Sequence, residues 1–260
     1  MGGEREAPVA QSIPILVLDQ VGSTNREAFA LAEAGEAGPL WIIARRQTAG
    51  RGRSDRPWVS MPGNLHASLL TRLPDPPGAL PQLSLVAGVA TIDAIRQAAG
   101  GGPAGLRLKW PNDVLIGQAK CAGILIESIA SRNTATVVIG IGIDLAWHPA
   151  DLGRAATDLA AHGCRVPPEA VLASLSEAMH SRLAAWDGGR GFAALRQAWL
   201  ERAGPVGEMI AVNTGRKRME GTFAGLDAEG ALVICDAHGQ RRTVTFGDVT
   251  LVAAAPQEAG

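Results

Sequence analysis

The sequence contains few of the residues and segments that mark secreted, metal-binding or membrane proteins. Its three cysteines are far apart and form no CxxC pair, and its five histidines form no HExxH pair. A disulfide framework or a zinc motif is therefore not supported. No apolar run approaches the roughly 20 residues that cross a bilayer, and the N-terminal residues form no apolar signal segment. These absences exclude a membrane span and lead us to expect a cytoplasmic protein.

The net charge of the chain is small, and lysine is rare. The net charge of −1 gives no electrostatic basis for nucleic acid as the main partner, so we expect no binding to DNA. Among 24 basic residues only Lys109, Lys120 and Lys217 are lysines. Two of the three fall within twelve residues, which favours a specific need for a compact ammonium group there.

The hydrophobic pattern predicts an α+β fold with a mixed or antiparallel sheet. Residues 24–27 match a capping box, which predicts a helix beginning at Thr24. Further helices are predicted at 82–98, 168–186 and 192–202. Strands are predicted at 13–19, 40–45, 64–72, 106–110, 114–116, 120–128 and 136–144. Short strands and turns after residue 204 predict a small SH3-like β-barrel. We therefore expect a larger domain over 1–203 and a small C-terminal domain over 204–256.

A segment rich in glycine and arginine, Gly50-Arg51-Gly52-Arg53, follows the second predicted strand. Glycines allow close approach of the backbone, and guanidinium groups bind phosphate or carboxylate through paired donors. The segment lacks both the Walker A pattern and the dinucleotide pattern GxGxxG. It predicts an anion site of another kind; the alternative is a solvated basic loop.

Four further patterns do not by themselves establish a functional role. Lys120 begins an apolar strand, where its ammonium group either reaches solvent or neutralises a bound anion. Gly140 and Gly142 alternate in a buried strand, which leaves a groove for a flat ligand or allows close packing of a helix. The polar run Ser23-Thr24-Asn25 and the turn in Lys109-Trp110-Pro111-Asn112-Asp113 are structural features when taken alone.

Taken in their order along the chain, these segments resemble the biotin protein ligase family. The match extends from about residue 15 to residue 145, and the predicted small barrel also fits. About twenty residues precede Ser23, so the resemblance implies the monofunctional form without an N-terminal DNA-binding domain. The matching residues are Ser23-Thr24-Asn25, Gln47, Gly50-Arg51-Gly52-Arg53, Arg56, Trp58, Gly63-Asn64-Leu65, Lys109-Trp110-Pro111-Asn112-Asp113, Lys120, Gly123-Ile124-Leu125 and Gly140-Ile141-Gly142.

The resemblance implies a reaction in two steps with biotin and ATP as substrates. The biotin carboxylate attacks the α-phosphate of ATP, which yields biotinyl-5′-adenylate and pyrophosphate. A lysine of a biotin carboxyl carrier domain then takes the biotinyl group. Mg²⁺ is expected with ATP and no structural metal is expected, while a homodimer is a family-level expectation.

The resemblance also implies roles for individual residues. Lys120 bridges the carboxylate and the α-phosphate as a catalytic residue, together with Arg51 and Arg53. Asp113 helps to place Mg²⁺. The expected biotin contacts are Ser23, Thr24, Asn25, Gln47, Gly50, Arg51, Gly52, Arg53, Lys120, Gly123 and Gly142. The expected ATP or adenylate contacts are Arg53, Arg56, Trp58, Lys109, Asn112, Asp113 and Lys120.

Three positions depart from the family pattern. Asp55 stands where glycine is usual, and we expect it to lie in a left-handed turn that faces solvent. His66 replaces a frequent tyrosine, and Asp144 replaces an asparagine. Two other functions remain open: a lipoate or octanoate ligase or transferase of the same fold, and a biotin-binding module without catalysis. The retained Lys120 and arginines favour a biotin ligase.

Overall fold

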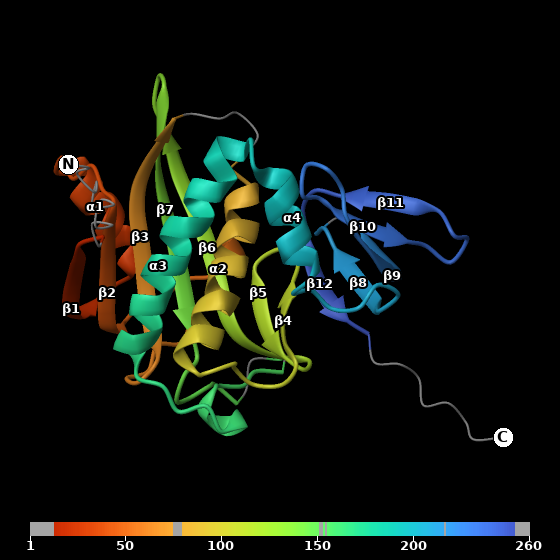
Figure 1. The fold of residues 1–260 in the computed structure, drawn as a ribbon, viewed down its shortest axis with the longest axis horizontal. Coiled ribbons are helices and arrows are strands. Elements are labelled where there is room, and N and C mark those ends of the chain that lie inside the picture. Colours follow the sequence, from red (N-terminus) through yellow and green to blue (C-terminus); the bar gives the residue numbers. More distant parts are fainter. Residues whose placement is uncertain (1–12, 75–79, 151–152, 154, 216, 253–260) are drawn as a thin grey trace, which may run out of the picture.

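A seven-stranded mixed sheet forms the larger part of the protein, with strand order β1-β2-β3-β7-β6-β5-β4 (Figure 1). The computed structural model describes residues 13–74, 80–150, 153, 155–215 and 217–252. Only β1 and β2 pair in parallel; the other neighbours in this sheet are antiparallel. The strands are β1 (Ile15–Val21), β2 (Leu40–Gln47), β3 (Leu65–Pro74), β4 (Leu106–Lys109), β5 (Asp113–Ile116), β6 (Ala119–Ala130) and β7 (Thr134–Ile143).

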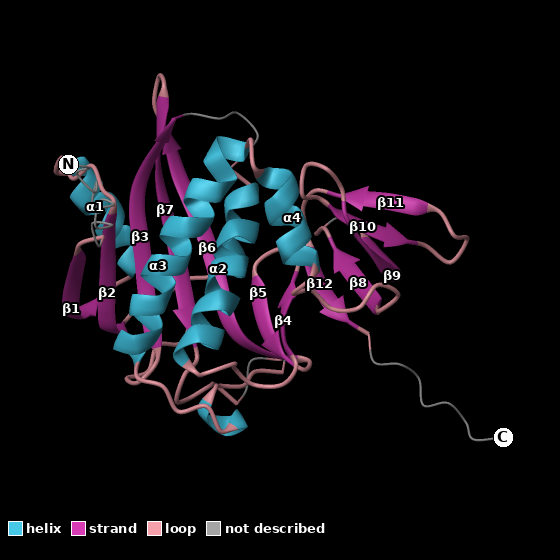
Figure 2. Cartoon of the chain, viewed as in Figure 1, coloured by secondary structure: helices cyan, strands magenta, loops and turns pink. Residues whose placement is uncertain are grey.

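Helices cover both faces of this sheet (Figure 2). The long helices α2 and α3 lie side by side on one face, and α1 contacts β2, β3 and β7. The helices are α1 (Thr24–Glu33), α2 (Gln82–Ala98), α3 (Pro168–Trp186) and α4 (Phe192–Leu200). Three short 3₁₀ turns, η1 (Arg53–Asp55), η2 (Ala160–His162) and η3 (Asp187–Gly189), lie in the connections.

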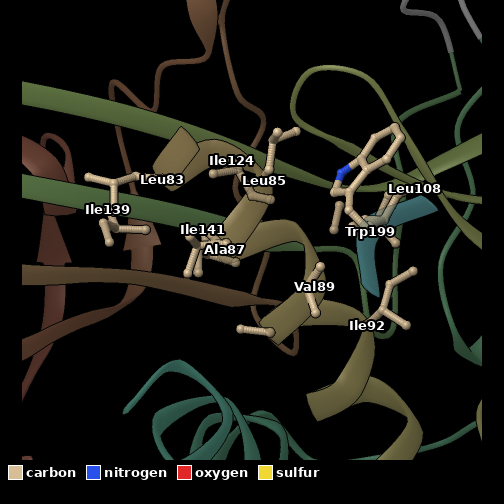
Figure 3. Packing of buried hydrophobic residues seen from close by; sticks show 14 of the residues in the cluster. Leu83, Leu85, Ala87, Val89, Ile92, Leu108, Ile124, Ile139, Ile141 and Trp199 are labelled. Atoms are coloured by element: carbon tan, nitrogen blue, oxygen red, sulfur yellow. The ribbon is translucent and has the colours of Figure 1, made fainter. Parts of the chain in front are cut away.

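Successive residues of the central strands enter different cores, because side chains in a strand alternate between the two faces. Ile139 of β7 belongs to the large core beneath α2 and α3, whereas Val138 belongs to the small core beneath α1. Figure 3 shows Ile139 and Ile141 of β7 on the side of the sheet that α2 covers with Leu83 and Ala87. Gly140 and Gly142 therefore face the opposite side, where α1 leaves part of the sheet uncovered.

A second, five-stranded antiparallel sheet of order β11-β10-β9-β8-β12 follows α4. Its strands are β8 (Met209–Asn213), β9 (Arg218–Leu226), β10 (Leu232–Cys235), β11 (Arg241–Val244) and β12 (Asp248–Leu251). It confirms the predicted small β domain, although its outer strands β11 and β12 do not pair within the described residues, so the barrel is not closed. Arg107 of β4 contacts Glu208 at 2.8 Å across the junction between the sheets. The domain boundary at 203/204 stays a prediction.

The predicted capping box at the start of α1 is wrong. Ser23 is the residue that precedes the helix, and no side chain caps the helix there. The Thr24 hydroxyl instead donates to Oε1 of the partly buried Gln47 of β2 at 3.1 Å. The first turn of α1 therefore presents its polar side chains to the sheet.

Candidate active site

A cavity of about 580 Å³ opens on the sheet face opposite α2 and α3. One row of neighbouring residues crosses five strands at its floor. Its members, in order, are His66, Gly142, Gly123, Asp113 and Lys109, each paired in register with the next. Side chains at paired positions share a face of a sheet, so the antiparallel pairing brings together motifs that are distant in the sequence.

A β-bulge places Lys120 on the same face as Gly123. Strict alternation would put these two residues on opposite faces, since they are three positions apart. The register of β6 against β5 shifts between Val114 and Leu115, which leaves Cys121 as the extra residue, and Lys120 pairs with Leu115. The Lys120 side chain consequently lines the cavity.

Lys109, Asp113 and Lys120 form the charged centre of the cavity. The Asp113 carboxylate accepts from both ammonium groups, through Oδ2 from Lys109 at 2.9 Å and through Oδ1 from Lys120. Burial alone raises the pKa of the Asp113 carboxyl, but the ammonium groups of Lys120 and Lys109 outweigh burial and hold that pKa well below its usual value. Asp113 is therefore ionised and orients both lysines.

The predicted role of Asp113 in placing Mg²⁺ stays a prediction, and this arrangement does not favour it. Both carboxylate oxygens already accept from ammonium groups. The described part of the chain also contains no cluster of three or more His, Cys, Asp or Glu side chains that could hold a metal ion. We derive no step through a protein-bound metal.

Polar side chains from α1 and β2 line one region of the cavity. Thr24 donates to Gln47 Oε1 through its backbone N–H at 2.9 Å. Ser68 of β3, a residue that the sequence analysis missed, lies 2.7 Å from the Thr24 hydroxyl and 2.6 Å from Asn25 Oδ1. Ser23, Thr24 and Asn25 are nearly fully buried. Both hydrogen-bond donors and acceptors are thus fixed in this region.

The segment at 50–58 is an ordered hairpin rather than an irregular loop. Backbone bonds from Trp58 N–H to the Gly50 carbonyl (2.9 Å) and from Gly52 N–H to the Arg56 carbonyl (2.7 Å) close it. Asp55 has φ +54° and an 86% exposed side chain, which confirms the expected left-handed, solvent-facing turn. Its carboxylate lies 3.3 Å from the Arg51 guanidinium.

Arg51 and Arg53 leave this hairpin toward different partners. Arg51 pairs with Glu127 of β6 at 3.1 Å. Arg53 donates to Asn112 Oδ1 and to the Gly247 carbonyl, both at 3.3 Å. Arg51 is therefore directed toward the floor of the sheet, whereas Arg53 is directed toward Asn112 and the small C-terminal sheet.

Trp58 lies over the glycine groove of the sheet. A Cβ atom added at Gly142 would be 2.5 Å from the Trp58 ring, so only glycine admits the indole at this position. The Lys120 ammonium group is 5.8 Å from the ring centroid. The indole therefore fills the groove beside Gly123 and Gly142, and the expectation that these glycines leave room for a ligand stays a prediction.

His66 holds the Trp58 indole by accepting from its Nε1–H at Nδ1 (3.4 Å). The side chain is only 1% exposed. Burial lowers the pKa of His66 to about 4, so the neutral imidazole accepts from Trp58 and its Nε2–H faces the Met61 carbonyl. His66, which stands where the family often has tyrosine, therefore supplies a hydrogen-bond acceptor for Trp58.

This depressed pKa predicts acid sensitivity of the fold. Between pH 6.5 and about 4 the unfolded chain binds a proton at His66 that the folded chain does not bind. The contribution of the neutral His66 to the free energy of unfolding is fully present above pH 6.5. About 3 kcal/mol of this free energy is lost as the pH falls from 6.5 to about 4. Urea unfolding at pH 7 and pH 4 should show a smaller loss for His66→Gln, which keeps an acceptor without titrating. Equal losses in both proteins would contradict this.

The small C-terminal sheet contributes residues that the sequence analysis did not identify. Asp248, Val249, Thr250 and Leu251 line the cavity. The Asp248 carboxylate accepts from Arg56 at 2.8 Å, and the Val249 carbonyl accepts from Lys109 at 2.9 Å. No sequence signal could have identified them, because the sequence of a single strand such as β12 does not indicate which other domain it meets.

The cavity brings together every predicted site residue except Gly50, which does not line it. A Cβ atom at Gly50 would lie 2.6 Å from the Trp58 carbonyl, so this glycine allows close packing inside the hairpin. Asp144 is buried outside the main cavity and accepts from Asn64 at 3.0 Å. Ser68 and Glu127 are polar residues in largely apolar strands. That pattern could have marked both residues as candidates for the site.

In the part of the chain that the structure describes, no helix combines the length and apolarity needed to cross a membrane.

Known protein families and known proteins match most of this chain. Residues 17–144 match the biotin/lipoate A/B protein ligase family, and residues 206–252 match the biotin protein ligase C terminal domain. The chain is 41% identical over 234 residues to the biotin–[acetyl-CoA-carboxylase] ligase of Paracoccus denitrificans, covering 86% of this chain and 95% of that protein. For the enzyme of the same name from Mycobacterium tuberculosis these values are 33%, 90% and 87%.

Solved structures agree with these relationships. The biotin protein ligase from Aquifex aeolicus in complex with biotin and ATP superimposes with a TM-score of 0.77 at 26% identity, covering 93% of this chain and 99% of that one. The overall fold is therefore shared with that structure. This chain belongs to the biotin protein ligase family.

Proposed function

We propose that this chain activates biotin with ATP and transfers the biotinyl group to a lysine of a biotin carboxyl carrier domain. One observation carries the proposal: a single cavity holds the Lys120 ammonium group, fixed polar groups such as Thr24 and Gln47, and the arginines of the hairpin. The polar groups suit a cyclic urea, which has both N–H donors and a carbonyl acceptor. The cations suit a carboxylate and phosphates.

The first step joins two anions. A carboxylate oxygen of biotin attacks the α-phosphorus of ATP, the bond to the bridging oxygen breaks, and pyrophosphate leaves. Lys120 and Arg51 offset the negative charge that accumulates where the two groups meet. Because Asp113 already orients the Lys120 ammonium group, this cation needs little reorganisation during the reaction.

The second step transfers the biotinyl group. The amine of a carrier lysine attacks the carbonyl carbon of the adenylate, an amide bond forms, and AMP leaves. The mixed anhydride must be shielded from water until the carrier arrives. Arg53, Asn112 and the hairpin that carries Trp58 are the residues that retain the adenylate in this proposal.

One assay tests the proposal against its two rivals. The purified chain is incubated with ATP, Mg²⁺ and either biotin or lipoate, with and without a biotin carrier domain. We expect pyrophosphate release with biotin and covalent biotin on the carrier. Tight biotin binding without pyrophosphate release would instead identify a non-catalytic binding module. Preference for lipoate or octanoate would identify the acyl ligase or transferase alternative.

Asp248 offers a prediction about the nucleotide side of the site. Its carboxylate lies 2.8 Å from Arg56 and 3.6 Å from Arg53, so it anchors the hairpin to β12. We expect Asp248→Ala to raise the KM for ATP by about fivefold, since the pair is partly exposed, with little change in the KM for biotin. Asp19→Ala, which removes an exposed pair with Arg45, is the matched control. Equal changes in both KM values would argue against a nucleotide-side role.

The compartment, the absence of DNA binding and the assembly state of the chain also remain proposals. ATP and newly made carrier domains meet in the cytoplasm, and we propose that the reaction takes place there. The net charge of −1 favours action without binding to DNA. A homodimer stays a prediction, which sedimentation of the purified chain with and without biotin would test.

A further inference from the structure

Glu127 lies behind the cavity wall and contacts two of the proposed biotin residues. It does not line the cavity. Its Oε1 is 3.1 Å from Arg51 Nη2, and its Oε2 accepts from Asn25 Nδ2 at 2.7 Å. The Arg51 and Glu127 side chains are only 26% and 28% exposed, so solvent screens this pair less than it screens a surface pair.

The position of Glu127 follows from the register of β6. It is four residues beyond Gly123 in a strand that is regular over this stretch, so it faces the same side of the sheet. The carboxylate can therefore reach both the hairpin, through Arg51, and α1, through Asn25. Glu127 thus connects these two elements.

One buried donor of Arg51, its Nε–H, faces no partner among the described residues. Nη1 of Arg51 faces Asp55 at 3.3 Å and Nη2 faces Glu127. The Arg51 Nε–H is buried and has no hydrogen-bond partner among the described residues. A buried donor without a partner is costly, so this N–H is suited to an acceptor that arrives with the substrate.

The same carboxylate fixes the amide of Asn25. Because Glu127 accepts from Nδ2, Oδ1 of Asn25 must face Ser68, which lies 2.6 Å away. Ser68 in turn contacts the Thr24 hydroxyl, which donates to Gln47. A continuous chain of contacts therefore runs from the arginine hairpin to the polar region of the cavity.

We infer that Glu127 is a positioning residue, which orients the Arg51 guanidinium and the Asn25 amide together so that both meet biotin in fixed geometry. This inference rests on the proposed function and deepens it. Without the carboxylate, Arg51 loses the partner that directs its Nε–H, and Asn25 loses the contact that sets which of its amide atoms faces Ser68. Biotin binding and adenylate formation both suffer, because the two residues contact biotin in the proposed function and Arg51 also offsets the charge that develops in the first step.

The test compares Glu127→Ala, Glu127→Gln and wild type by the KM for biotin, the KM for ATP and kcat, with pyrophosphate release as the readout. Loss of these two charge-assisted contacts predicts that Glu127→Ala raises the KM for biotin by at least about tenfold and also lowers kcat, while the KM for ATP changes by less than about threefold. Glu127→Gln keeps one acceptor and should fall between the other two. Glu220→Ala, which breaks a surface pair with Arg218, is the matched control.

A double-mutant cycle separates positioning from general stability. If Glu127 acts through Arg51, adding Glu127→Ala to Arg51→Ala should raise the KM for biotin by less than about threefold further. Multiplicative effects of the two substitutions, or a wild-type KM in Glu127→Ala, would overturn the inference. A lower KM in Glu127→Gln would also overturn it, since Glu127 would then compete with the substrate for Arg51. Absence of pyrophosphate release by wild type would instead refute the proposed function.

Discussion

Replacing Lys120 by alanine is expected to lower the rate of biotinyl-adenylate formation by about 10³-fold. Its ammonium group is the cation that the bulge in β6 directs into the cavity, and Asp113 holds it there. Two anions must approach one another in the first step, and a preorganised cation stabilises the charge that develops between them. Single-turnover measurement of pyrophosphate release at saturating biotin and ATP would give this rate directly.

The matched control for this substitution is Lys217→Ala, which removes an exposed lysine from the turn before β9. It should keep the wild-type rate. Removing Lys120 leaves the buried Asp113 with Lys109 as its remaining ammonium partner in the charged centre, so thermal unfolding of the variant must be compared with that of wild type. A folded Lys120→Ala protein with a wild-type adenylation rate would show that another group is the essential cation.

The second large effect is expected at Gly140, where a methyl group would collide with the Asn25 side chain. Asn25 is only 4% exposed and contacts both Ser68 and Glu127, so its amide cannot move away without losing these contacts. We expect Gly140→Ala to weaken biotin binding by about 30-fold, which corresponds to the loss of one or two buried hydrogen bonds. Isothermal titration with biotin measures this change in Kd.

Gly22→Ala is the control for Gly140→Ala. Gly22 directly precedes the polar residues of α1, but a Cβ atom there would meet no atom within 4 Å. Biotin should bind to this variant with wild-type affinity. Unchanged binding by Gly140→Ala would mean that Asn25 is not part of the biotin site, and equal weakening in both variants would indicate a general effect of added methyl groups.

Much of the local structure follows from hydrophobic periodicity and from glycine and proline breakers. The helices α2 and α3 have the predicted bounds, because each combines a regular apolar pattern with a clear stop. The strands shift by about two residues at their ends, as expected where end fraying rather than packing sets the boundary. The capping box failed because the Thr24 hydroxyl bonds to the partly buried Gln47 instead.

The candidate site was predictable to the extent that its residues share motifs with the family. Lys120, Arg51 and Asn112 were identified in this way, and the structure places them in one cavity. The partners of these residues were not identified. Glu127, Ser68 and Asp248 carry no recognisable motif of their own, and their importance depends on which side chains they meet.

The sequence by itself determined which residues carry charge and hydrogen-bonding groups, where helices and strands form, and which family the chain resembles. These properties depend on side-chain chemistry and on interactions between near neighbours. The tertiary structure alone decided that a bulge directs Lys120 to the same face as Gly123, that Glu127 contacts both Arg51 and Asn25, and that Asp248 of the C-terminal sheet meets the hairpin. Such contacts depend on strand register and on the approach of distant segments, which local sequence does not specify.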